Sequence, residues 1–180
     1  LASGATINVD AGEITHMLAD ETAGRLTIGD QKITVTGAIT VDNSNLLAAT
    51  TSGVITASIT TTETVDELQT LTGTGNAYTI VIANGDATGS TATEFTSING
   101  KTTVAVDASA VTGLASDNIS NIKTLLTAGN DTNQFTSDSF SSLATVVVSD
   151  TTLNGANLDS VIQRANTLTG DTSVVATITA

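Results

Sequence analysis

The sequence has no cysteine, no proline and no tryptophan, and its 180 residues include one methionine and one histidine. Without cysteine the chain has neither disulfide bonds nor cysteine-ligated zinc or iron–sulfur sites. Without proline the backbone amides remain available as donors, which suits strands that pair with a neighbour on both sides. Aromatic residues are almost as rare, since the full set is Tyr78, Phe95, Phe135 and Phe140.

Basic residues are also scarce, because five lysines and arginines stand against 18 acidic residues and give a net charge of −13. A nucleic-acid partner is therefore not expected, since binding phosphates needs a basic surface. The longest apolar runs have only three or four residues, as at residues 146–148, and are far too short for membrane insertion. An acidic surface does favour divalent cations such as Ca²⁺, which prefer carboxylate and carbonyl oxygens.

The remaining composition is typical of a folded chain with a thin core. Threonine supplies about a fifth of the residues, the hydrophobic fraction is 39% and the mean hydropathy is +0.21. Disordered chains are depleted in the isoleucine, valine and leucine found here. The chain starts at Leu1 without a signal-peptide pattern and stops at Ala180 within an alternating apolar run, so we expect a fragment of a longer chain.

Two windows, residues 64–73 and 91–100, follow one pattern of Thr-x-x-Glu, apolar residues three apart and a closing glycine. Thr-x-x-Glu is typical of a capping box, in which the threonine hydroxyl and the glutamate carboxylate each accept a hydrogen bond from a helix-start amide. A glycine is favoured after a helix because it readily adopts a left-handed backbone. Each window therefore predicts a short capped helix.

Weaker copies of this pattern extend in both directions along the chain and recur on average about every 22 residues. The further helices that they predict are centred on Ile119 and Ile122, Phe140 and Leu143, Leu158 and Val161, Ile14 and Met17, and Leu46 and Leu47. Between the helices, alternating β-branched residues predict strands. These strands are expected at residues 33–36, 54–56, 79–82, 103–106, 146–148 and 172–179.

A unit of one strand, one polar turn and one short helix is too small to bury its own apolar face. Stacked units solve this by forming a parallel sheet covered by a row of helices. We therefore predict an α/β solenoid of short parallel strands and short helices, one continuous array over residues 1–180, with an all-β β-helix or a β-sandwich as alternatives. The side chains expected in its core are Leu68, Leu71, Phe95, Ile98, Ile119, Ile122, Leu158 and Val161.

Two phrases of the sequence, TVDELQTL at residues 64–71 and TTVAVDASAVTGL at residues 102–114, resemble the repeats of giant surface proteins of cyanobacteria and other aquatic bacteria. The resemblance extends over about residues 40–180. The composition is similar to that of S-layer and type-I-secreted adhesin chains, which are acidic, rich in threonine and free of cysteine. The resemblance implies an extracellular structural or adhesive role at the bacterial cell surface and identifies no ligand.

Candidate catalytic residues lack the partners that catalysis requires. His16 is the only histidine, and although Asp20 and Glu21 follow it, no nucleophile motif accompanies them. The adjacent carboxylates of Asp66 and Glu67 are explained by capping, since negative charge is favoured at a helix N-terminus. Glycoside hydrolysis needs two acids placed across a cleft, and the chain has few arginines and aromatic residues to build one. We predict that the chain is not an enzyme.

Calcium is the most plausible small ligand, because oxygen donors gather in the turns between the expected elements. The candidate ligands are Asp42, Asn84, Asp86, Asp131 and Asp150. Neither an EF-hand loop nor a Gly-Gly-x-Gly-x-Asp nonapeptide is present in the sequence. The alternative explanation is that these Asp and Asn side chains form turns by bonding to nearby backbone amides.

These features favour a structural segment of a large secreted bacterial surface protein, in a surface layer, a filament or an adhesin stalk. Its expected partners are further copies of itself, since end strands have unpaired edges, and cell-surface polysaccharide. An adhesin module that binds a glycan or a host protein is the alternative, although such sites favour the aromatic residues and arginine that are scarce here. A polysaccharide-cleaving solenoid enzyme is the third hypothesis.

Overall fold

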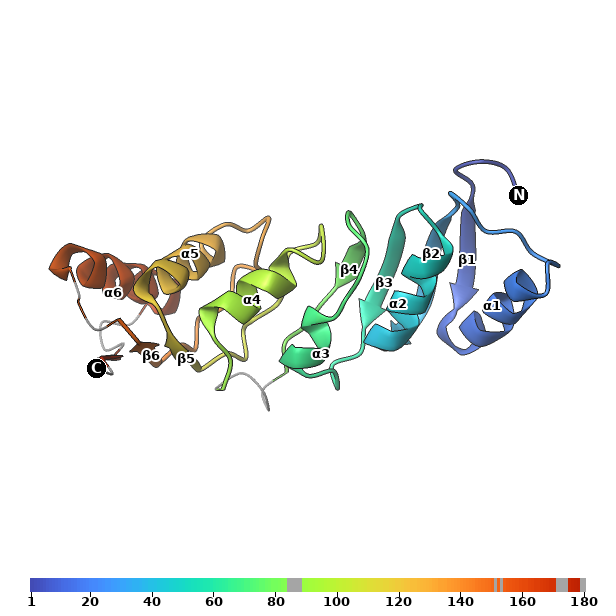
Figure 1. Cartoon of the computed structure of the whole chain (residues 1–180). Helices are drawn as coiled ribbons and strands as arrows, with labels where there is room; N and C mark the ends of the chain where they lie inside the picture. The colour runs from blue at the N-terminus through green and yellow to red at the C-terminus, as the bar shows by residue number, and fades with distance from the viewer. Residues whose placement is uncertain (84–88, 151, 153, 171–174, 179–180) are drawn as a thin grey trace.

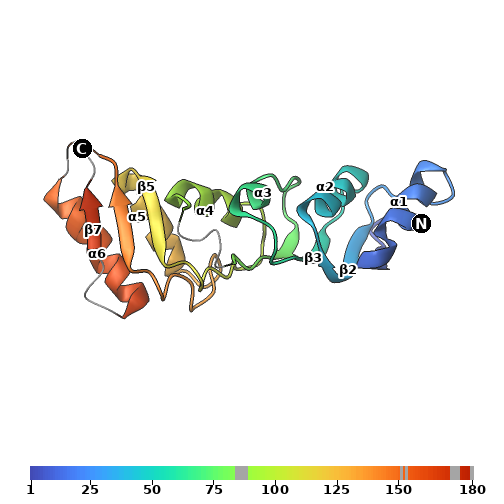
Figure 2. The same cartoon turned by 90° about the horizontal axis from the view of Figure 1, so that it is seen from below.

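A computed structural model of the chain describes residues 1–83, 89–150, 152, 154–170 and 175–178. Strands and helices alternate along an elongated row that has β1 at one end and β7 at the other (Figures 1 and 2). The strands are β1 (Thr6–Asp10), β2 (Lys32–Ile39), β3 (Ile55–Ile59), β4 (Ala77–Thr79), β5 (Gly113–Asp117), β6 (Thr145–Val148) and β7 (Val175–Ile178). The helices are α1 (Ile14–Thr22), α2 (Val41–Thr50), α3 (Val65–Gln69), α4 (Ala92–Asn99), α5 (Ile119–Gly129) and α6 (Gly155–Thr169), and a 3-10 turn (Ala11–Glu13) leads into α1. Within the described ranges no helix combines the length and the apolar composition needed to cross a membrane.

Within each of two sheets, every strand pairs in parallel with the strand before it in the chain. Strands β1 to β4 form one sheet and β5 to β7 form a second. Ile7 lies opposite Ile33, and Ile33 lies opposite Ile55, so apolar side chains repeat on one face from strand to strand. The helices form a second row alongside the strands (Figure 1). The predicted mixed α/β class with parallel strands is therefore confirmed.

Both predicted capping boxes are present at the starts of α3 and α4. Thr64 Oγ1 accepts from the Glu67 amide at 3.2 Å, while the Glu67 carboxylate accepts from the Thr64 amide at 2.7 Å. Thr91 and Glu94 make the same two bonds at the start of α4. The expected left-handed glycine after α4 is wrong, because Gly100 has a φ of −68° and continues the right-handed turn.

The helix predicted around Phe140 and Leu143 is wrong, because the chain forms turns there and Phe140 has a φ of +60°. Ser139 explains the turn through its contacts with the preceding unit. Its hydroxyl accepts from the Ala108 amide at 2.9 Å and donates to the Val106 carbonyl at 3.1 Å. Without this helix, successive helices begin 24 to 36 residues apart, which is wider than the expected spacing of about 22 residues.

The strands confirm part of the predicted pattern. Strands β2, β3 and β6 lie where alternation placed them, whereas β1 and β5 were not expected. The predicted strand at residues 103–106 is not regular, because Val106 forms only an isolated bridge with Phe135. Of the strand expected at residues 172–179, β7 covers the central part, and residues 172–174 and 179 lie outside the described residues.

One hydrophobic core runs along the row between the strands and the helices. Seven of the eight residues predicted to point inward are buried, and the eighth, Leu158, packs against the core while partly exposed. The three phenylalanines meet in the middle of the chain. The ring of Phe140 lies 5.9 Å from that of Phe95 and 5.1 Å from that of Phe135, both in edge-on contact. Two of these rings come from the long segment between α5 and α6, and the third comes from α4.

Candidate functional site

The predicted calcium ligands lie at separate places in the fold. Asp42 is in the first turn of α2, Asp131 follows α5, and Asp150 follows β6. Asn84 and Asp86 lie outside the described residues. In the part of the chain that the structure describes, no three His, Asp or Glu side chains are grouped so that they could hold a metal ion. Calcium binding stays a prediction.

Asp131 is held within its own turn. Its carboxylate accepts from Gln134 Nε2 at 2.9 Å, from the Asn133 amide at 3.0 Å and from Asn133 Nδ2 at 2.9 Å. These bonds favour the ionised form, so Gln134 first and Asn133 second lower the pKa of Asp131 below its usual 3.8. The turn-forming alternative therefore has direct support at this residue.

Three other carboxylates bond to the helix of the preceding unit, and we call them the junction carboxylates: Glu63, Asp117 and Asp150. Amides in the first turn of a helix have no partner within the helix, and the helix dipole favours a negative charge beside them. The bonds run from Val41 N to Glu63 at 3.2 Å, from Thr93 N to Asp117 at 2.9 Å and from Ile119 N to Asp150 at 2.6 Å. Acidic residues thus connect successive units without a metal.

The residues considered for catalysis make local contacts. His16 Nδ1 lies 3.0 Å from a Glu13 carboxylate oxygen, and both side chains are well exposed, at 79% and 65%. The Glu67 carboxylate is bonded by the Thr64 amide and then by the Thr64 hydroxyl, and these bonds lower the pKa of Glu67 below its usual 4.5. The carboxylates of Glu13 and Glu67 therefore both have local partners, and a structural role is enough to explain these contacts. The expectation that the chain is not an enzyme stays a prediction.

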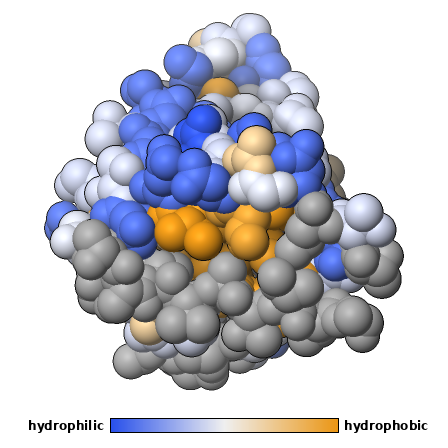
Figure 3. Space-filling model, turned by 90° about the vertical axis from the view of Figure 1, so that its left-hand side faces the viewer, coloured by the Kyte–Doolittle hydropathy of each residue, from blue (hydrophilic) through white to orange (hydrophobic). Residues whose placement is uncertain are grey.

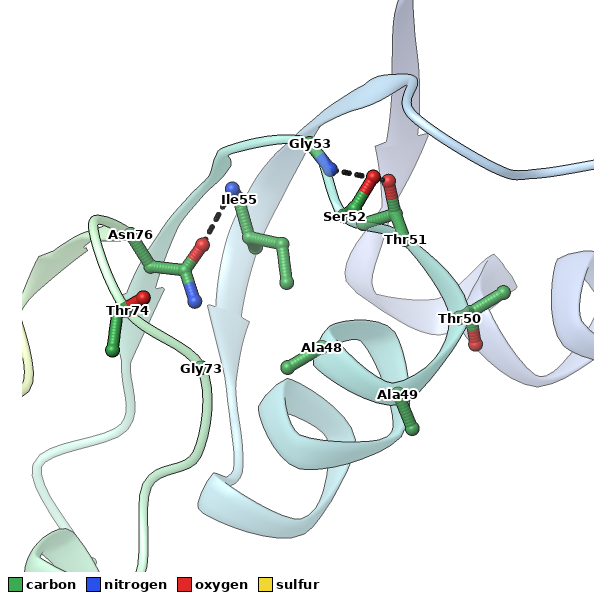
Figure 4. A pocket seen from close by; sticks show the side chains of 10 residues that line it. All are labelled: Ala48, Ala49, Thr50, Thr51, Ser52, Gly53, Ile55, Gly73, Thr74 and Asn76. Atoms are coloured by element: carbon green, nitrogen blue, oxygen red, sulfur yellow. Dashed lines mark hydrogen bonds between the residues drawn. The ribbon is translucent and has the colours of Figure 1, made fainter.

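A groove opens between the C-terminal end of α2 and the segment that leads from α3 to β4. The groove has a volume of about 480 Å³ and is lined by the end of α2, the turn into β3 and the segment before β4 (Figure 4). Its lining side chains are small and uncharged. A ligand here would meet hydroxyl, amide and methyl groups, and no ionised side chain.

The most buried polar side chain of the groove is already paired. Asn76 is 3% exposed, accepts from the Ile55 amide at 2.9 Å through Oδ1 and donates to the Tyr78 hydroxyl at 3.1 Å through Nδ2. Burial raises the pKa of Tyr78 to about 12, although the bond from Asn76 acts in the opposite direction. Tyr78 is therefore a neutral core residue at ordinary pH, and its hydroxyl faces Asn76 rather than solvent.

The polar groups at the rim of the groove also have hydrogen-bond partners within the chain. Thr51 Oγ1 accepts from the Gly53 amide at 2.9 Å (Figure 4). The same hydroxyl donates to the Gln31 carbonyl at 2.6 Å. A β-carbon on Gly53 would lie 2.6 Å from the carbonyl carbon of Gln31, so the two backbone segments are in direct contact. The polar groups of the groove therefore mainly hold neighbouring backbone segments together.

Exposed aromatic rings, which commonly hold sugars, are absent from this surface. Tyr78 and the three phenylalanines are all fully buried, and the sequence has no tryptophan. The outward face of the first sheet presents short polar side chains instead. Asn8, Thr34 and Thr56 lie opposite one another on β1, β2 and β3.

The geometry defines a class of protein: a mixed α/β fold with parallel strands in two sheets, in which side-chain hydrogen bonds join successive segments of an acidic chain. No family model, no curated protein and no solved structure matches the chain. The junction carboxylates are the feature that the sequence analysis missed. A signal was available for two of them, since Glu63 and Asp117 each stand directly before the N-cap of the next helix.

Proposed function

We propose that the chain is a non-enzymatic structural segment of a large secreted bacterial surface protein, part of a surface layer, a filament or an adhesin stalk. In this proposal the units form an α/β solenoid, one continuous array that coats the extracellular surface of the cell. The single observation that carries the proposal is the order of the parallel strands, which follows the chain through two successive sheets, β1 to β4 and β5 to β7, along an elongated row. Such an arrangement gains length with every unit.

Self-association is the activity that we propose for this segment. Within the described residues β1 pairs only with β2, and β7 pairs only with β6, so each end of the row has an unpaired edge. Figure 3 looks onto the end that contains α6 and shows apolar side chains exposed at its centre. Unpaired edges and exposed apolar surface both favour contact with another copy. Cell-surface polysaccharide is a second proposed partner.

The alternative functions have less support. A glycan-binding adhesin module would be favoured by exposed aromatic rings, and all four of the rings in this chain are buried. A polysaccharide-cleaving enzyme would need acids clustered in a cleft, whereas the groove beside α3 is lined by uncharged residues. The structural proposal needs neither feature.

Electron microscopy of the purified chain, with and without millimolar Ca²⁺, tests the proposal. Ordered sheets or filaments are expected. Monomeric particles under both conditions would overturn self-association and would direct the next experiment to a glycan-binding screen.

Whether Ca²⁺ stabilises the fold or the oligomers is tested separately. If Ca²⁺ bridges acidic turns, chelation by EDTA lowers the melting temperature or disassembles the oligomers. A melting temperature and an oligomeric state that both stay unchanged would remove calcium from the account, while the order of the strands and the self-association test would stand.

A further inference from the structure

The boundary between the two sheets lies between β4 and β5, and no regular strand pairing crosses it in the described residues. α4 follows β4, the last strand of the first sheet, while α5 follows β5, the first strand of the second sheet. Between these strands the described backbone forms the isolated bridge of Val81 with Asp107 and scattered amide–carbonyl bonds, with no continuous ladder. Contacts between α4 and α5 therefore matter for holding the two sheets together.

Asp117 joins α4 to α5 with four hydrogen bonds on one carboxylate. From α4, the Thr93 amide and the Thr93 hydroxyl donate to Oδ2 at 2.9 and 2.8 Å. From the start of α5, the Asn118 amide and Asn121 Nδ2 donate to Oδ1 at 2.7 and 2.8 Å. Each oxygen accepts from a different helix, so the carboxylate is shared by the two sides of the boundary.

The charged groups nearest to this carboxylate are already engaged or lie farther along a helix. Glu94 on α4 bonds to its own N-cap, and Asp150 after β6 bonds to Ile119 at 2.6 Å. Lys123 on α5 borders a shallow groove between the two helices. No ion pair joins Asp117 to a base in the described part of the chain, so its charge is stabilised by the four donors alone.

We propose that this boundary is an acid-sensitive joint: when Asp117 takes up a proton, α4 and α5 loosen and the two sheets uncouple there before the rest of the chain unfolds. A protonated carboxyl is an uncharged and therefore weaker acceptor, and it carries an O–H donor of its own where four donors already converge. The buried contact of Phe95 on α4 with Phe140 also crosses the boundary and carries no titratable group, so the loss on protonation falls on the bonds of Asp117. This joint depends on the fold and not on the surface role proposed above.

The direction of the pH effect follows from the pKa of Asp117. Partial burial alone would raise this pKa, but the bonds from Asn121, Thr93 and Asn118 outweigh burial and lower it below 3.8. A pKa that is lower in the folded chain than in the unfolded chain stabilises the fold above the unfolded value. The stabilisation is lost as the pH falls through the depressed folded value, so the joint loosens in acid below about pH 4.

Thermal unfolding of Asp117→Asn, compared with wild type and with Asp138→Asn at an exposed carboxylate, tests the charge. At about pH 7 the D117N variant is expected to melt about 3–10 °C lower than wild type, because bonds to a charged acceptor are lost. The difference should shrink at about pH 2, where wild type is protonated too. Thr93→Val removes the hydroxyl that donates to Asp117 and accepts from Asn121 Nδ2, while the Thr93 amide bond remains. It should give a smaller shift of the same kind, which keeps the test open if D117N does not fold.

Amide hydrogen exchange measured by mass spectrometry tests the location, after correction for the pH dependence of intrinsic exchange. Protection in acid is expected to fall over residues 93–121 while it persists over residues 33–59. Loss of protection that is uniform, or that starts in β2 and β3, would overturn the joint. An unchanged melting temperature for D117N at about pH 7 would overturn the role of the carboxylate.

Discussion

Replacing Gly53 by alanine tests how tightly neighbouring units approach each other. A β-carbon at this position would meet the Gln31 carbonyl oxygen, and it would lie 2.6 Å from the Gln31 carbonyl carbon and 2.7 Å from the Asp30 oxygen. All three atoms belong to the backbone, so none can swing aside as a flexible side chain would. The substitution must therefore push apart the backbone segments that lead into β2 and β3.

The expected magnitude combines two opposing terms. Inserting a methyl group into a packed contact costs about 1–3 kcal/mol. Restricting the unfolded chain by replacing glycine with alanine returns about 0.4–1 kcal/mol. The displaced backbone also strains the bonds that Thr51 makes to Gln31 and Gly53. We expect a net loss of about 1–2 kcal/mol, which lowers the melting temperature of a chain of this size by about 2–8 °C.

Circular dichroism during heating measures this shift, and Gly155→Ala provides the matched control. Gly155 is the first residue of α6, and nothing lies within 4 Å of a β-carbon placed there. The control should therefore melt at or slightly above the wild-type temperature, since alanine is the better helix former by up to about 1 kcal/mol. If G53A melts as high as G155A, the contact at Gln31 yields easily and the steric reasoning is refuted.

Three further substitutions test the core, the turn at Phe140 and the helix caps. Phe95→Ala should lose about 2–5 kcal/mol of unfolding free energy in urea, and the partly exposed Leu158 should lose less on the same change. Ser139→Ala leaves the buried Ala108 amide without its acceptor, while the Val106 carbonyl still accepts from the Thr136 amide, and should cost about 1–3 kcal/mol, against under about 0.5 kcal/mol for the exposed Ser137. Thr64→Ala should cost about 1 kcal/mol in a thermal melt by removing an N-cap; an equal loss for Thr62→Ala would contradict the capping box.

The helix starts were predictable because their signals are local. In a capping box, the threonine and the glutamate are three residues apart and bond to each other's amides, as Thr64 and Thr91 do with their partners. The strands with alternating β-branched residues were predictable for the same reason. Burial of Leu68, Phe95 and Ile122 followed from helical spacing, which places residues three and four apart on one face.

The remaining features depend on contacts between units, which local patterns do not encode. Phe140 and Leu143 have helical spacing, yet the hydroxyl of Ser139 bonds 31 and 33 residues away and fixes a turn instead. The junction carboxylates lie 22 to 31 residues from the amides that they close, and this distance differs between units. Only the register of the stacked strands shows which acid meets which helix.

The junction carboxylates give the row a polarity, because each bond runs from a later unit back to the helix before it. A helix such as α4 therefore has its first-turn amide at Thr93 closed only once Asp117 has been added to the chain. Removing units from the C-terminal side should uncap the last remaining helix, whereas removing them from the N-terminal side leaves the later helices closed. During synthesis, each new unit would supply the carboxylate that closes the first turn of the helix made just before it. Folding would then advance from the N-terminus towards the C-terminus.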